Sequence, residues 1–147
     1  MPAGGVEVRP TIDREWLERA ESAEPLTHAY ALWDLTRTPQ LVRFASAIRG
    51  ETTVGYLLLW LGAGDRPVVH WFGPLEVAGA LAGALPAPPF VAVVPPEVEP
   101  VLARRYPAVR SSPLKMMLRE PGGLAPAPGA VRRLVRADRP ALEELVR

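Results

Sequence analysis

The residue types that could do chemistry are few and widely spaced in this chain. Its two histidines, His28 and His70, belong to different predicted elements, and there is no cysteine to complete a metal site with them. An isolated histidine of this kind is more often structural than a metal ligand, so we expect no metal. The sequence contains neither a Gly-x-Ser-x-Gly nucleophile elbow nor a phosphate loop. Glu51 belongs to a predicted turn, where we expect it to be solvated.

Composition narrows the class of protein. The 147 residues correspond to about one domain. The 17 basic residues are spread along the chain and nearly balance the 16 acidic ones, which predicts no nucleic-acid partner. The N-terminus is not a signal peptide, and the most apolar stretch, residues 54–61, is too short to span a bilayer. We therefore expect a cytoplasmic protein with no membrane partner, and the lack of cysteine excludes a disulfide scaffold.

Hydrophobic periodicity predicts the elements that would position these residues. Residues 6–9 alternate as a short strand, and Thr11 is expected to cap a first helix. Pro25 suits the first position of a second amphipathic helix that ends near Thr38. The apolar stripe predicted for the first helix is Trp16, Leu17 and Ala20, and that for the second is Leu26, Ala29, Tyr30, Trp33 and Leu35.

Three strands are predicted next, over residues 41–48, 53–60 and 67–72. Short glycine-containing turns join them, so we expect an antiparallel meander. Within the second of these strands, Gly55 predicts a bulge or a close approach of another backbone segment.

The remaining elements alternate between helix and strand. Gly73-Pro74 is expected to open a helix that runs to Leu85. Residues 90–94 form a short apolar run, typical of a strand buried on both faces. A helix is predicted from Pro95-Pro96 to Arg105, and a last strand over residues 113–119.

The predicted order, β-α-α-β-β-β-α-β-α-β, resembles the fold of the GNAT (Gcn5-related) N-acetyltransferases. The resemblance covers residues 6–120, and three stretches, 25–35, 53–58 and 70–73, are similar to the N-terminal part of prokaryotic GNAT proteins. It implies an α/β (α+β) domain with a GNAT-like mixed sheet. It also implies acetyl-CoA as cofactor and a small-molecule or peptide amine as acetyl acceptor.

In the family, a Gln/Arg-x-x-Gly-x-Gly/Ala turn after the third meander strand binds the cofactor's pyrophosphate through backbone N–H groups. The resemblance places Phe72, Gly73 and Leu75 at this cofactor-binding turn. Gly73 would allow a close approach of phosphate, but Pro74 removes a donor and Glu76 adds a negative charge. We therefore expect a domain without the usual CoA-binding loop.

The resemblance also implies roles for aromatic side chains. Tyr106 follows the helix after the parallel strand, where a catalytic tyrosine acid often lies in the family. The alternative for Tyr106 is a half-buried aromatic packed against the sheet. The parallel strands of a GNAT sheet usually splay and leave an apolar cleft, which Tyr56, Trp60 and Trp71 would line as the substrate cleft.

The C-terminal part of the sequence resembles the opening of another domain. Residues 121–129 are a Pro/Gly/Ala linker between a GNAT-like domain over residues 1–120 and a strand and helix over residues 130–147. We expect residues 130–147 to be the truncated start of a second GNAT domain, or else a strand and helix packed on the first domain. The apolar face of that helix would need cover, from a second GNAT domain or a homodimer. Its members are Leu142, Leu145 and Val146.

Three functions follow from these features. The chain is the degenerate N-terminal half of a two-domain N-acetyltransferase, or a free-standing, non-catalytic GNAT-like module that binds a ligand or partner. The third alternative is an active enzyme that holds CoA in an unusual way. The fold does not select the acceptor amine.

Overall fold

The computed structural model describes residues 5–107, 110–114 and 137 of the chain. The chain divides into two units, Met1–Arg110 and Ser111–Arg147. All the helices and strands below belong to the first unit. The predicted strand over residues 113–119, the linker over 121–129 and the strand and helix over 130–147 lie wholly or almost wholly outside the described residues.

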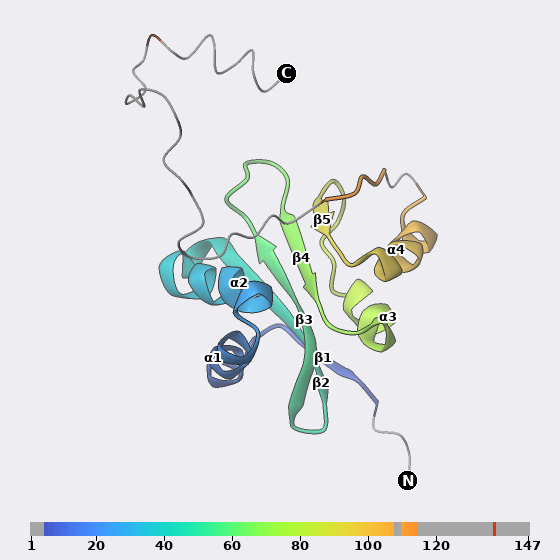
Figure 1. The fold of residues 1–147 in the computed structure, drawn as a ribbon. Coiled ribbons are helices and arrows are strands. Elements are labelled where there is room, and N and C mark those ends of the chain that lie inside the picture. Colours follow the sequence, from blue (N-terminus) through green and yellow to red (C-terminus); the bar gives the residue numbers. More distant parts are fainter. Residues whose placement is uncertain (1–4, 108–109, 115–136, 138–147) are drawn as a thin grey trace, which may run out of the picture. The chain divides into compact units, whose positions relative to one another are not determined.

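A five-stranded mixed sheet forms the centre of the first unit (Figure 1). The strands are arranged in sequence order, and every neighbouring pair is antiparallel except β4 and β5, which are parallel. The predicted meander of three antiparallel strands is therefore confirmed. The strands are β1 (Glu7–Arg9), β2 (Val42–Arg49), β3 (Thr52–Trp60), β4 (Val68–Phe72) and β5 (Val91–Val93).

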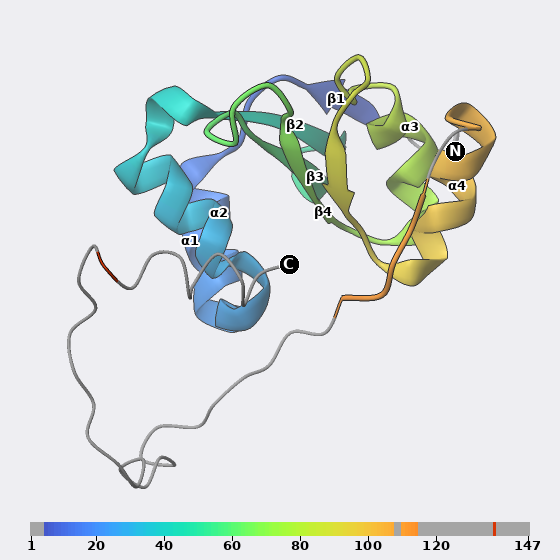
Figure 2. The ribbon, with the colours of Figure 1, turned by 90° about the horizontal axis from the view of Figure 1, so that it is seen from above.

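Helices cover both faces of this sheet, with α1 and α2 on one face and α3 and α4 on the other (Figure 2). Their bounds are α1 (Arg14–Ala23), α2 (Pro25–Arg37), α3 (Ala78–Ala82) and α4 (Glu99–Arg105). Short 3₁₀ turns precede β2, α3 and α4, at η1 (Pro39–Leu41), η2 (Leu75–Val77) and η3 (Pro96–Val98). The order through α4 is β-α-α-β-β-β-α-β-α, so the mixed α+β class and the GNAT-like element order are confirmed as far as the described elements reach.

Each face of the sheet has its own apolar core. On the α1/α2 face, alternate residues of β2 and β3 pack against the two helices; the buried members are Leu17, Ala31, Val42, Phe44, Tyr56 and Leu58. The intervening residues of the same strands face α3 and α4; the buried members of that core include Ala45, Leu57, Val69, Trp71, Val77, Leu81 and Leu102. This two-sided burial follows from the alternation of side chains along a strand.

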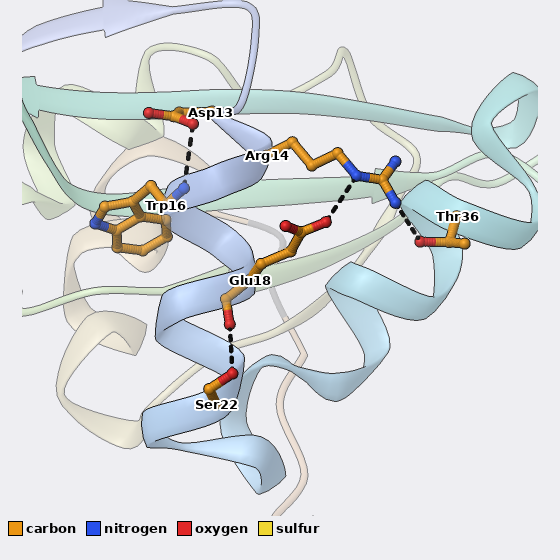
Figure 3. Close-up of polar contacts among 6 residues, drawn as sticks. All are labelled: Asp13, Arg14, Trp16, Glu18, Ser22 and Thr36. Carbon is orange, nitrogen blue, oxygen red and sulfur yellow. Dashed lines mark hydrogen bonds and ion pairs between the residues drawn. The ribbon is translucent and has the colours of Figure 1, made fainter.

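Helix α1 begins two residues later than the sequence predicts. Asp13 is the N-cap, because its carboxylate accepts a hydrogen bond of 3.1 Å from the backbone N–H of Trp16 (Figure 3). The prediction that Thr11 caps this helix is wrong. The Thr11 carbonyl instead accepts a hydrogen bond from the hydroxyl of Ser46 on β2, which ties this part of the chain to the sheet.

Helix α2 begins at Pro25 as predicted, but it turns most of its predicted apolar stripe toward solvent. Leu26 is 58% exposed, and Tyr30 and Trp33 are each 61% exposed. The face that packs on the sheet carries Ala31 and Leu35 instead. Because α2 has apolar residues on both faces, periodicity alone did not identify the buried one.

The last strand and the helix before it are shorter than predicted. β5 is not buried on both faces: Val91 is 49% exposed, because β5 is the last strand of the described sheet and pairs only with β4. The helix predicted to reach Leu85 ends at Ala82, where the N–H of Gly83 turns back to the carbonyls of Ala80 and Leu81.

The tightest backbone contact of the fold joins β3 to the turn after β4. The register between β2 and β3 shifts at Val54, so the predicted bulge at this position is confirmed. A Cβ atom on Gly55 would lie 2.8 Å from the carbonyl oxygen of Phe72 and 3.2 Å from Cα of Gly73. Gly73 itself has a φ of 134°, which disfavours any side chain. The close approach predicted for Gly55 is therefore confirmed.

We predict that Gly55→Ala destabilises the fold by about 1–3 kcal/mol, because backbone atoms must move to admit the methyl group. The matched control is Gly79→Ala in α3, where a Cβ atom would meet nothing within 4 Å. The control should be neutral or stabilising by up to about 1 kcal/mol, since alanine is the better helix former. Urea unfolding measures both. Equal stability of the Gly55 variant and the parent would contradict the contact.

Candidate functional site

The turn that follows β4 is the place where the sequence predicts cofactor binding. Its three predicted residues differ in environment. Phe72 stacks on Tyr56 with ring centroids 4.5 Å apart, Gly73 lies against Gly55, and the side chain of Leu75 is 49% exposed. The side chain of Phe72 thus belongs to the α1/α2 core, whereas Leu75 extends from the turn.

Two backbone N–H groups of this turn are used within it. Pro74 has no N–H, the N–H of Val77 donates to the Pro74 carbonyl, and the N–H of Ala78 donates to the Leu75 carbonyl. Glu76 is exposed in the same turn. Anion binding at a helix N-terminus depends on unpaired N–H groups and suffers from a nearby carboxylate. Pro74 and Glu76 both weaken this turn as an anion site, and the lack of the usual CoA-binding loop stays a prediction.

Beside this turn, β4 and β5 stop pairing. Their parallel ladder has three residue pairs and ends at His70 with Val93. Pro95 and Pro96 follow on the β5 side, and neither has an N–H to extend the ladder. Trp71, the next residue of β4, is 4% exposed, and its indole N–H has no hydrogen-bond partner. A bulky apolar ring therefore fills the α3/α4 side of the place where the two strands part.

The three residues predicted to line a substrate cleft do not share one face. Tyr56 and Trp60 lie in β3 on the side of α1 and α2. Trp71 is paired with Leu57 and belongs to the α3/α4 core. Tyr56 is fully buried, and Trp60 is half-buried. The structure therefore does not bring them together around a common cleft, and their contact with a ligand stays a prediction.

Tyr106, the predicted catalytic tyrosine, follows α4 directly. It is half-buried, and its ring meets Phe90 edge-on with centroids 5.3 Å apart. The guanidinium of Arg105 lies over the ring, 5.8 Å from the centroid, and its Nε donates to the phenol oxygen at 3.3 Å. This is the packing expected of the structural alternative, and a catalytic role for Tyr106 stays a prediction.

Sequence reasoning missed an aromatic cluster under α1 and α2. The Nδ1 atom of His28 shares a hydrogen bond of 2.8 Å with the phenol of Tyr56. Trp16 meets both rings edge-on, at 6.0 Å from His28 and 5.9 Å from Tyr56. The histidine and the tyrosine are 28 residues apart in sequence, and only the packing of α2 on β3 joins them.

Burial sets the protonation of this pair. It lowers the pKa of His28, against the opposing effect of the carboxylates of Glu24 and Glu21. Burial also raises the pKa of Tyr56, so the phenol stays protonated. The phenol of this pair is fully buried, whereas the imidazole of His28 is half-buried.

A second pair, also missed, lies where α2 meets β4. The ring of Tyr30 stacks on that of His70 with centroids 6.3 Å apart. Burial lowers the pKa of His70, and the charge of Asp34 partly offsets this. Burial correspondingly raises the pKa of Asp34. A half-buried imidazole with a carboxylate nearby is a candidate general base, so His70 is one candidate for acid–base chemistry among the described residues.

Two other features of the described residues bear on function. Over residues 5–107 and the short described segments after them, no three His, Asp or Glu side chains gather as a metal site would require. No helix in this part of the chain is long and apolar enough to cross a membrane.

No family model matches this chain, and no curated protein matches it either. Among solved structures, it is similar to aminoglycoside N-acetyltransferase AAC(6')-Iy in complex with CoA. The two share 14% sequence identity with a TM-score of 0.47, over 82% of this chain and 99% of that chain. The fold class stated above rests on the element order and sheet topology of this chain.

We predict that lowering the pH from about 7.5 to about 5.5 reduces the free energy of unfolding. His28 and His70 both have pKa values below the ordinary 6.5. The unfolded chain therefore binds more protons than the folded one in this range, so stability is complete above about pH 6.5 and falls as the pH drops through it. Urea unfolding of the parent and of a His28→Gln/His70→Gln variant measures the slope. An unchanged slope in the double variant would contradict this origin.

We also predict that Tyr56→Phe destabilises the fold by about 1–2 kcal/mol, because the Nδ1 atom of His28 loses its buried partner. Tyr30→Phe is the control, because the Tyr30 side chain is 61% exposed. Its effect should stay within about 0.5 kcal/mol. Chemical denaturation compares the two variants, and equal effects would show that the buried bond contributes nothing.

Proposed function

We propose that this chain is the GNAT-like, non-cofactor-binding half of an N-acetyltransferase, an enzyme that transfers acetyl from acetyl-CoA to an amine. In this proposal a downstream domain, of which residues 130–147 are the start, binds the cofactor and carries out the transfer. The present domain supports the fold and shapes the side where the amine acceptor binds. The confirmed element order through α4 supports the GNAT-like part of the proposal.

The observation that carries the proposal is the closed turn after β4. Pro74 lacks an N–H, those of Val77 and Ala78 are bonded within the turn, and Gly73 is held against Gly55. A pyrophosphate would have to displace these contacts and approach the carboxylate of Glu76. In this proposal a second turn, in the downstream domain, binds the pyrophosphate.

His70 on β4 and Asp34 on α2 support the part of the proposal that concerns the amine acceptor. His70 is neutral near neutral pH, and Asp34 adds a negative charge that attracts a protonated amine. These groups suit a small-molecule or peptide amine.

A second candidate function is a non-catalytic GNAT-like module that binds a ligand or partner. The exposed apolar face of α2 favours it, since such a face is typical of an interaction surface. The reading frame after codon 147 distinguishes the two functions. A following Gln/Arg-x-x-Gly-x-Gly/Ala turn supports the acetyltransferase half, whereas a stop codon favours the binding module.

We predict that this 147-residue chain does not bind acetyl-CoA at concentrations up to about 1 mM. Calorimetric titration measures binding directly, and thermal unfolding with and without cofactor gives an independent measure. A ligand at 100 times its dissociation constant would stabilise the folded state by about 2.7 kcal/mol, which a thermal shift would detect. Micromolar binding would overturn the proposal and would justify a screen of acceptor amines on this chain.

A further inference from the structure

The solvent face of α2 is unusually apolar. Leu26, Tyr30 and Trp33 lie at positions i, i+4 and i+7, which places them in one row along the helix, and all three are more than half exposed. We call this row the α2 stripe. Ala29, beside it, lines a shallow hollow together with Tyr30 and Trp33.

The neighbouring helix shows what an ordinary solvated face looks like in this protein. The exposed face of α1 carries an i,i+4 ion pair from Arg14 to Glu18 at 2.9 Å (Figure 3). A second such pair joins Arg19 to Glu15 at 4.0 Å. Helices α1 and α2 thus lie side by side on one face of the sheet. The solvent face of α1 is polar, whereas α2 has apolar residues on both its solvent face and its sheet-facing side. A helix that is apolar all round is usually buried.

The charges at the two ends of α2 identify what could cover the stripe. Glu24 caps the N-terminal end and is exposed, whereas Arg37 is exposed in the last turn. The guanidinium of Arg37 lies 5.1 Å from the centroid of the Trp33 ring, so it continues the stripe. Two such helices packed antiparallel bring acidic and basic ends together, and their dipoles also oppose. A parallel pair would bring like charges together.

We propose that the α2 stripe is the contact surface between two copies of this chain, with their α2 helices antiparallel across a two-fold axis. Such an interface is self-complementary: if one residue contacts a second residue of the other copy, that second residue in the first copy makes the same contact in return. Near the axis, Tyr30 of one copy meets Trp33 of the other, and the shallow hollow beside Ala29 accepts part of the opposing ring. The proposal rests on α2 alone and does not depend on acetyltransferase activity.

The size of the stripe sets the strength of the association. A fully buried aromatic side chain removes about 150–250 Å² from water, and Tyr30 and Trp33 are each 61% exposed before association. With Leu26 and the stem of Arg37 added, the two copies together bury about 1,000 Å², which is at the lower end for specific dimers. The dimer should therefore be reversible, with a dissociation constant of about 1–100 μM.

Sedimentation velocity over a range of protein concentrations tests the association. The parent chain should change from monomer to dimer, and Trp33→Asp should raise the dissociation constant at least about tenfold because it buries a charge at the contact. Leu75→Asp is the matched control. Leu75, like Trp33, is an exposed large apolar residue, but it lies in the turn after β4, so its variant should dimerise like the parent. Circular dichroism checks that both variants fold.

Cross-linking tests whether α2 forms the contact surface, and the chain has no cysteine to interfere. Ala29→Cys should form a covalent dimer with a short bis-maleimide reagent, whereas Gly79→Cys, on α3 at the other face of the sheet, should not. A parent chain that stays monomeric at several hundred micromolar would overturn the proposal and leave the stripe to a different protein. Equal cross-linking of the two cysteine variants would overturn it as well.

Discussion

The contact between Gly55 and Gly73 is the constraint on which much of the remaining structure depends. It joins the centre of β3 to the first residue after β4, at a separation that admits no side chain on either residue. Val77 packs against both glycines and is fully buried in the α3/α4 core. A substitution that separated the two glycines would therefore disturb both the meander and the packing of α3 on the sheet. The turn continues from Gly73 into η2, where the N–H groups of Val77 and Ala78 donate to carbonyls of the turn itself.

The two faces of the sheet serve different purposes in this domain. The α3/α4 face is an apolar core in which Trp71 occupies the point where β4 and β5 part. The α1/α2 face combines an apolar layer with the domain's two histidines, each held neutral by burial. His28 and His70 are both half-buried, and burial lowers the pKa of each. Both imidazoles, the candidates for acid–base chemistry among the described residues, therefore lie on the α1/α2 face of the sheet.

Much of the fold could be predicted from local sequence signals. Glycine-containing turns located the meander, Pro25 located the start of α2, and Gly55 indicated both the bulge and the close contact. The orientation of α2 could not be predicted, because Tyr30 and Trp33 have the residue types of a core and nothing local shows which face meets the sheet. The pairing of His28 with Tyr56 also required the tertiary fold, since neither residue carries a local sign of its partner. The poor anion site expected from proline and glutamate at positions 74 and 76 stays a prediction, and it needed only the sequence because the effects of both residues are local.

The shortness of the outer strands has a consequence for how this domain can meet other molecules. Among the described residues, both edges of the sheet are three-residue strands, β1 and β5, whereas β2 and β3 have eight and nine residues. β5 also lies between Pro88-Pro89 and Pro95-Pro96, which supply no backbone donors. An incoming strand would thus find few groups to pair with, and intermolecular sheet growth of the amyloid type has little template here. Among the described strands, both margins of the sheet therefore offer few backbone groups to an incoming strand.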